Sequence, residues 1–226
     1  MKRKFPKFVL LLFLLSHGLS ILNAQQFVSI RGSIVDAHSR EMLPARLYIE
    51  SASGEFFHAE SASEQGDAVP YSKVRGNGSV EVHTTLSAHS FKADLPPGAY
   101  TISAERGKEY LTASQQIVVS NTQAPQPIVL SLKRWINMAE LGWYSGETHV
   151  HRTVEDLPTL MLAEDLNVTF PLTAWVTDTR ATPKLKNKNP DPVPPPELIE
   201  VDSTHVIWPV NTEYEIFTVN GNRHTL

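Results

Sequence analysis

The chain has 226 residues, with 20 Lys or Arg against 24 Asp or Glu, and its formal net charge is −4. Charges of both signs are interspersed, so no basic stripe indicates a nucleic-acid partner and no acidic block indicates a disordered tail. The sequence contains no cysteine. An exported form would therefore depend on core packing or bound metal for its stability, and not on disulfides.

The first 24 residues have the layout of a secretory signal peptide. A basic start, MKRKFPK, precedes an apolar run, and the small residue Ala24 follows at a plausible cleavage point. The strictly apolar part is shorter than the ~20 residues that a membrane span needs. We therefore expect a secreted or periplasmic protein that has no membrane partner after cleavage. The alternative is that the segment is retained as a membrane anchor.

Residues 25–132 are predicted to form a small antiparallel β-sandwich. Short runs alternate apolar and polar residues with a period of two, which is typical of half-buried strands. Turn signals rich in Gly, Pro, Ser and Asn separate these runs. The clearest runs begin at Phe27, Ala45, Ser79, Gly98, Gln115 and Pro127. Several short strands with this spacing favour a sandwich over a helical fold.

Two segments of this region resemble carboxypeptidase regulatory-like and related prealbumin-like domains. The segment ADLPPGAYTISAERGKEY, residues 93–110, has an apolar residue, a Pro-Gly turn and an aromatic that leads into a strand. The segment IRGSIVDAHSREMLPARLYI, residues 30–49, has a strand, a polar turn and a second strand after a proline. The resemblance covers residues 27–132 and implies an accessory module, usually without catalytic residues.

The pattern changes after residue 133. Residues 146–176 are predicted to be strand, helix, strand, which is the repeating unit of an α/β barrel or a parallel sheet. The helix would begin after Asp156, with Pro158 in its first turn, or earlier with Thr153 in a capping box. The final segment, residues 168–176, is predicted to be one buried strand. A proline-rich loop over residues 181–204 and a return to strands complete the chain, with a hairpin turn at the sequence NGN.

His149 and His151 form the most informative pattern in the sequence. On a strand, both imidazoles project to the same side, with Cα atoms about 6.5–7 Å apart. That spacing suits two ligands of one metal ion, since each Zn–N bond is about 2.0–2.1 Å. Their position, at a strand end before a helix, is where α/β barrels place catalytic residues. The alternative is a pair of polar side chains on a solvated strand.

The segment GWYSGETHVHRTVEDLPTLMLAEDLNV, residues 142–168, resembles the first metal-binding motif of the polymerase and histidinol phosphatase (PHP) superfamily. The closest match is the CehA/McbA type, whose usual motif is G-D-x-H-x-H. This resemblance implies a distorted (β/α)7 barrel that holds two or three divalent ions, typically Zn, Mn or Fe. It also implies hydrolysis of a phosphoester, ester or amide-like bond in an unidentified small-molecule or carbohydrate-like substrate.

The resemblance assigns His149 and His151 as metal ligands. Asp178 matches the family's T-D-H motif, but Thr179 stands where the family has histidine. Glu147 replaces the more usual Asp and is expected to orient a ligand imidazole.

Further candidates lie downstream. Glu213, with Glu215 as the alternate, matches the family's Glu-containing motif, and His224 matches a later histidine. The candidate metal ligands are therefore His149, His151, Asp178, Glu213 and His224.

Residues 133–226 are expected to be only the N-terminal part of a PHP-type domain, an incomplete α/β domain, because a complete barrel needs roughly 200 residues or more. The competing hypothesis is a non-catalytic secreted sandwich with a degenerate hydrolase remnant. The remaining histidines are expected to be surface or turn residues: His38, His58, His83, His89 and His205. The four tryptophans are expected to pack at the domain junction and in the barrel: Trp135, Trp143, Trp175 and Trp208.

Overall fold

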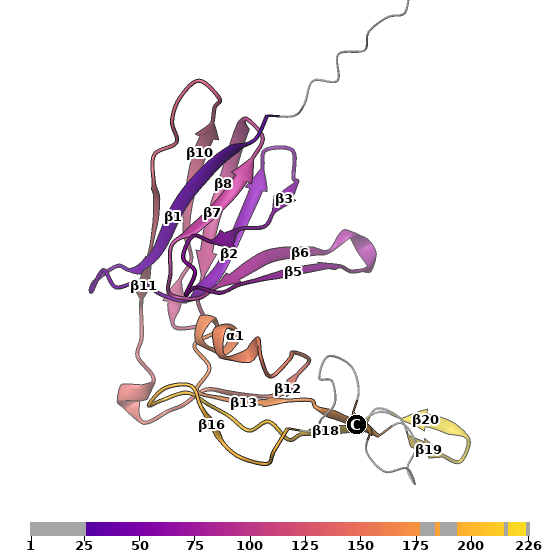
Figure 1. Cartoon of the computed structure of the whole chain (residues 1–226). Coiled ribbons are helices and arrows are strands. Elements are labelled where there is room, and N and C mark those ends of the chain that lie inside the picture. The colour runs from indigo at the N-terminus through magenta and orange to yellow at the C-terminus, as the bar shows by residue number, and fades with distance from the viewer. Residues whose placement is uncertain (1–25, 177–183, 186–193, 215–216, 225–226) are drawn as a thin grey trace, which may run out of the picture.

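A computed structural model describes residues 26–176, 184–185, 194–214 and 217–224, and these residues are mostly β, with several sheets and one short α-helix (Figure 1). The expected signal peptide, residues 1–24, lies outside this part of the chain. Among the described residues, no helix is long and apolar enough to cross a membrane.

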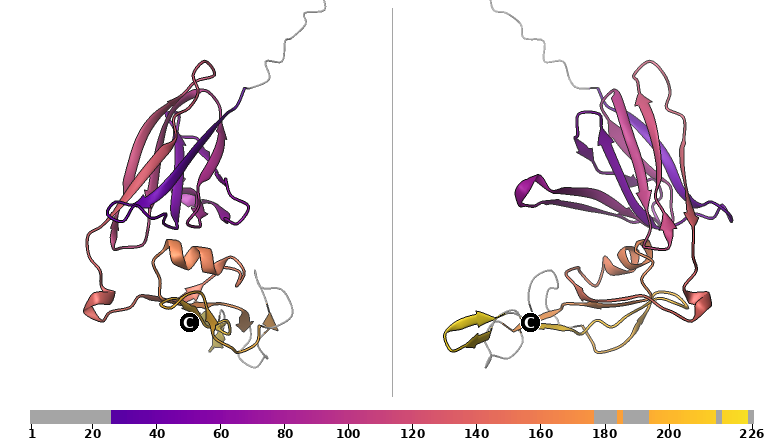
Figure 2. Two further views of the ribbon diagram at one scale, coloured as in Figure 1. Left: turned by 60° about the vertical axis from the view of Figure 1, so that its left-hand side comes forward. Right: turned by 180° about the vertical axis from the view of Figure 1, so that it is seen from behind.

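Residues 28–134, here called the sandwich, form two sheets that pack face to face (Figures 1 and 2). The five-stranded sheet has, in spatial order, β4 (Glu60–Ser61), β7 (Phe91–Leu95), β1 (Val28–Asp36), β11 (Ile128–Arg134) and β9 (Tyr110–Leu111). The six-stranded sheet has β10 (Ala113–Val119), β8 (Gly98–Glu105), β2 (Ala45–Ser51), β6 (Val80–Leu86) and β5 (Ala68–Val74), with β3 (Phe56–Phe57) beside β2.

The predicted period-two alternation places the core between these sheets. In β2, for example, Ala45, Leu47 and Ile49 are buried and the residues between them are not. Both sheets contribute to one cluster of buried residues, in which Phe91 is fully buried. The prediction of an entirely antiparallel sandwich is wrong in one place, because β1 and β11 pair in parallel. Alternation determines which face a side chain takes, but not the direction of the neighbouring strand.

A second, smaller part follows the sandwich in the order that the sequence predicts. Strand β12 (Gly146–Val150), helix α1 (Leu157–Ala163) and strand β13 (Val168–Pro171) succeed one another. A four-stranded sheet has the order β12, β13, β17 (Val206–Ile207) and β16 (Ile199–Glu200). A three-stranded sheet has the order β15 (Lys184–Leu185), β14 (Ala174–Val176) and β18 (Thr212–Tyr214). A hairpin of β19 (Phe217–Val219) and β20 (Asn222–His224) completes it.

The parallel pairs β12–β13, β13–β17 and β14–β18 agree with the expected parallel α/β arrangement. Residues 168–176, however, are two short strands in different sheets and not one strand. The break falls at Leu172 and Thr173, whose amide N–H groups donate to Val150 and Asn211. Within the described ranges the sheets stay open, and no barrel closes.

Two local predictions are decided by hydrogen bonds and backbone angles. Helix α1 begins at Leu157, directly after Asp156 and with Pro158 in its first turn, so the start predicted after Asp156 is confirmed and the earlier start is wrong. The Asp156 side chain does not cap the helix, and Thr153 Oγ1 accepts the Asp156 N–H at 3.0 Å, which is one of the two hydrogen bonds of the predicted capping box. The NGN turn joins β19 and β20 with positive φ angles of 51° at Asn220 and 79° at Gly221. Both angles suit the tight hairpin turn that Asn-Gly favours.

The smaller part is fixed to the sandwich by a set of charged side chains, here called the junction: Arg46, Arg106, Arg134, Glu164 and Asp165. Arg106, whose side chain is only 7% exposed, donates to Asp165 Oδ1 at 2.6 Å. Arg134 reaches Asp165 Oδ2 at 3.0 Å, and Arg46 reaches Glu164 Oε1 at 2.7 Å. Helix α1 therefore lies between the sandwich and the smaller sheets (Figure 1).

Candidate metal centre

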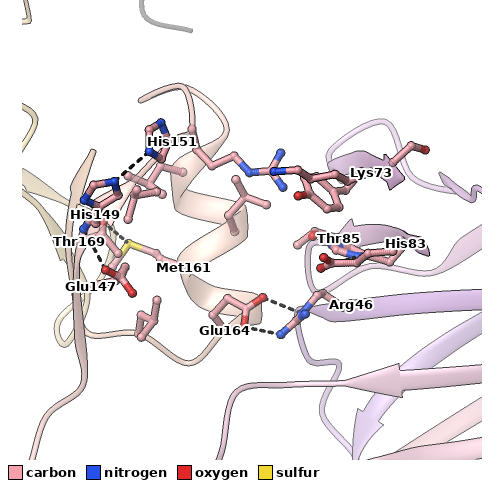
Figure 3. A pocket seen from close by; sticks show the side chains of 18 of the residues that line it. Arg46, Lys73, His83, Thr85, Glu147, His149, His151, Met161, Glu164 and Thr169 are labelled. Atoms are coloured by element: carbon pink, nitrogen blue, oxygen red, sulfur yellow. Dashed lines mark hydrogen bonds and ion pairs between the residues drawn. The ribbon is translucent and has the colours of Figure 1, made fainter. Parts of the chain in front are cut away.

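The two histidines of the H-x-H pattern lie together at the carboxyl end of β12. Their Nε2 atoms are 3.0 Å apart, and the side chains of His149 and His151 are 54% and 44% exposed (Figure 3). Strand β12 pairs with β13 in parallel, with a register irregularity between Glu147 and Val150. Both imidazoles thus point the same way, as the period of two predicts.

Glu213 joins the histidines from β18, which is far away in the sequence. Its Oε1 lies 3.6 Å from His149 Nε2, and its Oε2 lies 3.6 Å from His151 Nε2. One ligand atom from each of the three residues lies within 4.8 Å of the other two. We call these residues the candidate metal group. Two nitrogen donors and one carboxylate therefore meet at one point.

The geometry of this group fits one divalent cation. Ligand atoms about 2.0–2.1 Å from a tetrahedral ion are about 3.4 Å from one another. The two Nε2 atoms are 3.0 Å apart, and each of them lies 3.6 Å from a different oxygen of Glu213. Glu213 Oε2 is buried, and no described residue donates a hydrogen bond to it. A buried carboxylate oxygen without a donor is unfavourable, and a cation at this point would satisfy it.

Asn211 positions the strand that carries Glu213, and sequence reasoning missed it. Its Nδ2 donates to the carbonyl oxygens of Thr148 in β12 and Phe170 in β13, at 2.9 and 3.2 Å. Its backbone carbonyl oxygen accepts hydrogen bonds from the backbone N–H groups of Thr173 and Ala174. The side chain therefore joins β12, β13 and the start of β18. A lone Asn two residues before a Glu gives no sequence signal of this role, because its partners are backbone carbonyls of distant strands.

Trp175 packs beside the candidate metal group. It pairs with Glu213 across β14 and β18, its ring centroid is 5.3 Å from that of His151, and it is buried, as expected for a packing residue. The same expectation is wrong for Trp135 and Trp143, which are 59% and 68% exposed. They lie in the connection before β12, which the smaller part does not cover.

The expected role of Glu147 is not the one observed. Its Oε1 accepts the backbone N–H of His149 at 2.9 Å, so it supports the backbone of the H-x-H segment and does not orient an imidazole. Asp178 and Glu215 lie outside the described residues. His224 belongs to β20, but its side chain also lies outside the described part of the chain. The structure thus brings together His149, His151 and Glu213 from the candidate ligands.

Two other histidines were expected at the surface and are buried, His83 at 4% exposure and His205 at 9%. Burial disfavours the imidazolium form of His83 and, together with Arg46, lowers its pKa to about 4. His205 lies against Asp202, with Nδ1 2.8 Å from Oδ1. Neither belongs to the candidate metal group.

A cleft of about 890 Å³ opens beside the candidate metal group, between α1 and the hairpin of β5 and β6 (Figure 3). His149 and His151 line one side of it, and residues of the sandwich line the other. Both parts of the molecule therefore line the same cleft.

No protein-family model matches the chain, and no curated protein sequence is significantly similar to it. The likeness to the PHP superfamily accordingly depends on the motif residues quoted above.

Proposed function

We propose that the chain is an exported metal-dependent hydrolase of the PHP type, with a carboxypeptidase regulatory-like, prealbumin-like sandwich and the N-terminal part of a (β/α)7 domain. The observation that carries this proposal is the candidate metal group. His149, His151 and Glu213 converge on one point, and one oxygen of Glu213 is buried without a donor from any described residue. The H-x-H motif and its helix supply the family likeness.

The residues in place fit a catalytic ion better than a structural one. Two imidazoles and one carboxylate leave a fourth position open, as hydrolytic metal sites do. His149 and His151 border the cleft, so that position faces a space that a substrate can enter. When bound, Zn, Mn or Fe would bring the pKa of a coordinated water near neutrality and polarise the scissile bond. Asp178 and His224 remain candidates for a second ion.

The test is a calorimetric titration of the purified chain with Zn²⁺ and Mn²⁺, and with Fe²⁺ under anaerobic conditions. We expect at least one ion per chain. His149→Ala and Glu213→Gln should weaken metal binding by at least about 100-fold. Removal of a residue that only supports a ligand costs about 10–100-fold, and removal of a ligand itself should cost at least as much. The matched control is His38→Ala, an exposed turn histidine. Unchanged affinity in both site variants would sink the proposal.

A non-catalytic secreted module is the second candidate, and Thr179 favours it, because the PHP motif has histidine at that position. The two functions differ in turnover. Metal-loaded chain that fails to hydrolyse 4-nitrophenyl acetate, 4-nitrophenyl phosphate and bis(4-nitrophenyl) phosphate would favour the binding module. Hydrolysis that is lost in His149→Ala would exclude it.

Export is part of the proposal and has its own test. Cleavage after Ala24 would give a mature chain that begins at Gln25, which N-terminal sequencing of the secreted or periplasmic protein would detect. Recovery of the uncut chain in the membrane fraction would show that the segment is an anchor.

A further inference from the structure

The cleft beside the candidate metal group has a second wall that the sandwich supplies. This wall is the hairpin of β5 and β6, which projects from the sandwich over the smaller part (Figures 1 and 3). Tyr71, Lys73 and Arg75 line the cleft, in steps of two residues. Side chains two apart on an extended segment share one face, and Arg75, the residue after β5, is also extended. The hairpin therefore presents one aromatic and two cationic groups to the cleft.

The charges of this wall are only partly compensated. Lys73 pairs in register with Glu81, while Arg75 Nη1 binds Glu81 Oε2 at 2.8 Å. Two cations thus flank one carboxylate. Lys73 forms no ion pair within the described part of the chain. Tyr71 faces His83 in the register, and burial keeps that imidazole neutral at pH 7.

The opposite wall of the cleft is also cationic. The guanidinium of Arg152, next to His151, lies 4.5 Å from the centre of the Tyr71 ring. Arg46 is neutralised by Glu164 at 2.7 Å. Among the described residues that line the cleft, the cations Arg46, Lys73, Arg75 and Arg152 outnumber the carboxylates Glu81, Glu147 and Glu164. This excess occurs in a chain whose net charge is −4, so it is a local feature of the cleft.

The floor of the cleft is apolar. Leu157, Leu160 and Met161 of α1 line it, and α1 packs against Val69 of the hairpin. An apolar floor with a few convergent polar groups is the usual composition of a small-molecule site.

We infer that the hairpin of β5 and β6 is a specificity-determining wall of this cleft, and that Lys73 and Arg152 recognise a negatively charged group on an organic ligand whose apolar body lies against α1. The reaction that follows binding rests on the proposed function. Binding itself does not, because the charged group is held by the hairpin and not by the metal. The sandwich is then part of the site and not an accessory module.

The test compares two probes of the same shape, the anion 4-nitrobenzoate and the neutral 4-nitrobenzamide, by equilibrium dialysis against the purified chain treated with EDTA. Removing metal ensures that a carboxylate cannot be retained by the ion. We expect the anion to bind about fivefold more tightly, the upper range for one solvent-exposed charge pair. This preference should weaken as salt rises from low to physiological concentration.

Lys73→Glu should abolish the preference for the anion. The matched control is Lys133→Glu, an exposed lysine on β11 that does not line the cleft, and it should retain the preference. Arg152→Gln should reduce the preference in part. Equal binding of both probes to the unaltered chain, or equal behaviour of the two lysine variants, would overturn the inference.

The same protein preparation separates this result from the metal proposal. If Zn²⁺ binds and the anion is not preferred, only the inference about the hairpin fails. If the anion is preferred and no ion binds, only the metal proposal fails.

Discussion

The sandwich and the smaller part differ in how they form a hydrophobic core. Among the described residues, the sandwich core contains 17 buried side chains from both sheets, whereas the core around α1 contains four, Leu157, Leu160, Met161 and Ile207. The second cluster is extended by Val69, a residue of β5 in the sandwich. The sandwich is therefore self-sufficient, while the part that carries the candidate metal group shares a core with its neighbour.

The difference explains why charged side chains join the two parts, and why two of them are nearly buried. Arg106 and Asp165 are almost fully covered where the two parts meet, and Arg106 also donates to the Pro44 carbonyl oxygen at 2.8 Å. Gly107 lies in the same contact with φ +48°, and a Cβ there would be 2.5 Å from the carbonyl oxygen of Glu164. A small core that depends on another surface needs a defined orientation on it, which this network supplies. Its hydrogen-bond geometry is directional in a way that apolar contact is not.

The largest expected effect comes from the sandwich core. Phe91→Ala should lower the free energy of unfolding by about 4 kcal/mol, since it leaves a cavity between the sheets. Because the smaller part depends on the sandwich, hydrogen exchange should show that residues 146–171 lose protection together with β1 and β2. Val129→Ala on β11, an exposed position, should change the stability by no more than about 0.5 kcal/mol. Independent unfolding of the two parts would contradict the comparison.

Asp165→Asn should affect the smaller part selectively. The variant keeps the size and the positive φ of 55°, which Asn tolerates, but leaves the buried Arg106 without its charged partner. Loss of one member of a buried pair destabilises by about 3 kcal/mol. We expect faster proteolysis and hydrogen exchange in residues 146–171 with an unchanged sandwich. Glu155→Gln, an exposed carboxylate just before α1, is the matched control. If the sandwich lost as much hydrogen-exchange protection as residues 146–171, the junction would not act selectively on the smaller part.

Acid should weaken the hairpin through His83. Its pKa in the folded chain is about 4, below the ordinary 6.5, because burial and Arg46 disfavour the imidazolium. The unfolded chain therefore takes up this proton as pH falls below 6.5, while the folded chain stays neutral. The stability present above pH 6.5 is lost as pH falls toward 4, by about 3 kcal/mol.

The measurement is urea unfolding at several pH values. His83→Gln should show a flatter pH dependence between pH 6.5 and 4, because it removes the titrating group. His38→Gln, at an exposed turn, should follow the unaltered chain. A slope that is the same in all three proteins would exclude His83 as the source.

The sequence predicts most of what alternation and local turn chemistry can encode. The strands that begin at Val28, Ala45 and Gly98 follow directly from the period of two, and Asn-Gly predicts the β19–β20 hairpin. The parallel pairing of β1 with β11 does not follow from this pattern, because it depends on the path that the chain takes through all the strands between them. In the candidate metal group, the H-x-H spacing is local and visible, whereas the approach of Glu213 is created by strand pairing.

The smallest of these effects, and the one most specific to the site, should come from Asn211→Ala. The variant removes hydrogen bonds to Thr148 and Phe170, which hold β18 against β12 and β13, and it substitutes neither Glu213 nor the two histidines. Each such bond contributes about 1 kcal/mol, so the global stability should fall by about 1–2 kcal/mol. Affinity for Zn²⁺ should also fall, by about tenfold, because Glu213 is no longer held at 3.6 Å from the imidazoles. Calorimetric titration measures this change. The control is Asn137→Ala, because the Asn137 side chain donates to Glu140 and lies outside the candidate metal group. If the two asparagine variants bind Zn²⁺ equally, the position of Glu213 is not set by Asn211. The smaller part would then organise its ligands by strand pairing alone.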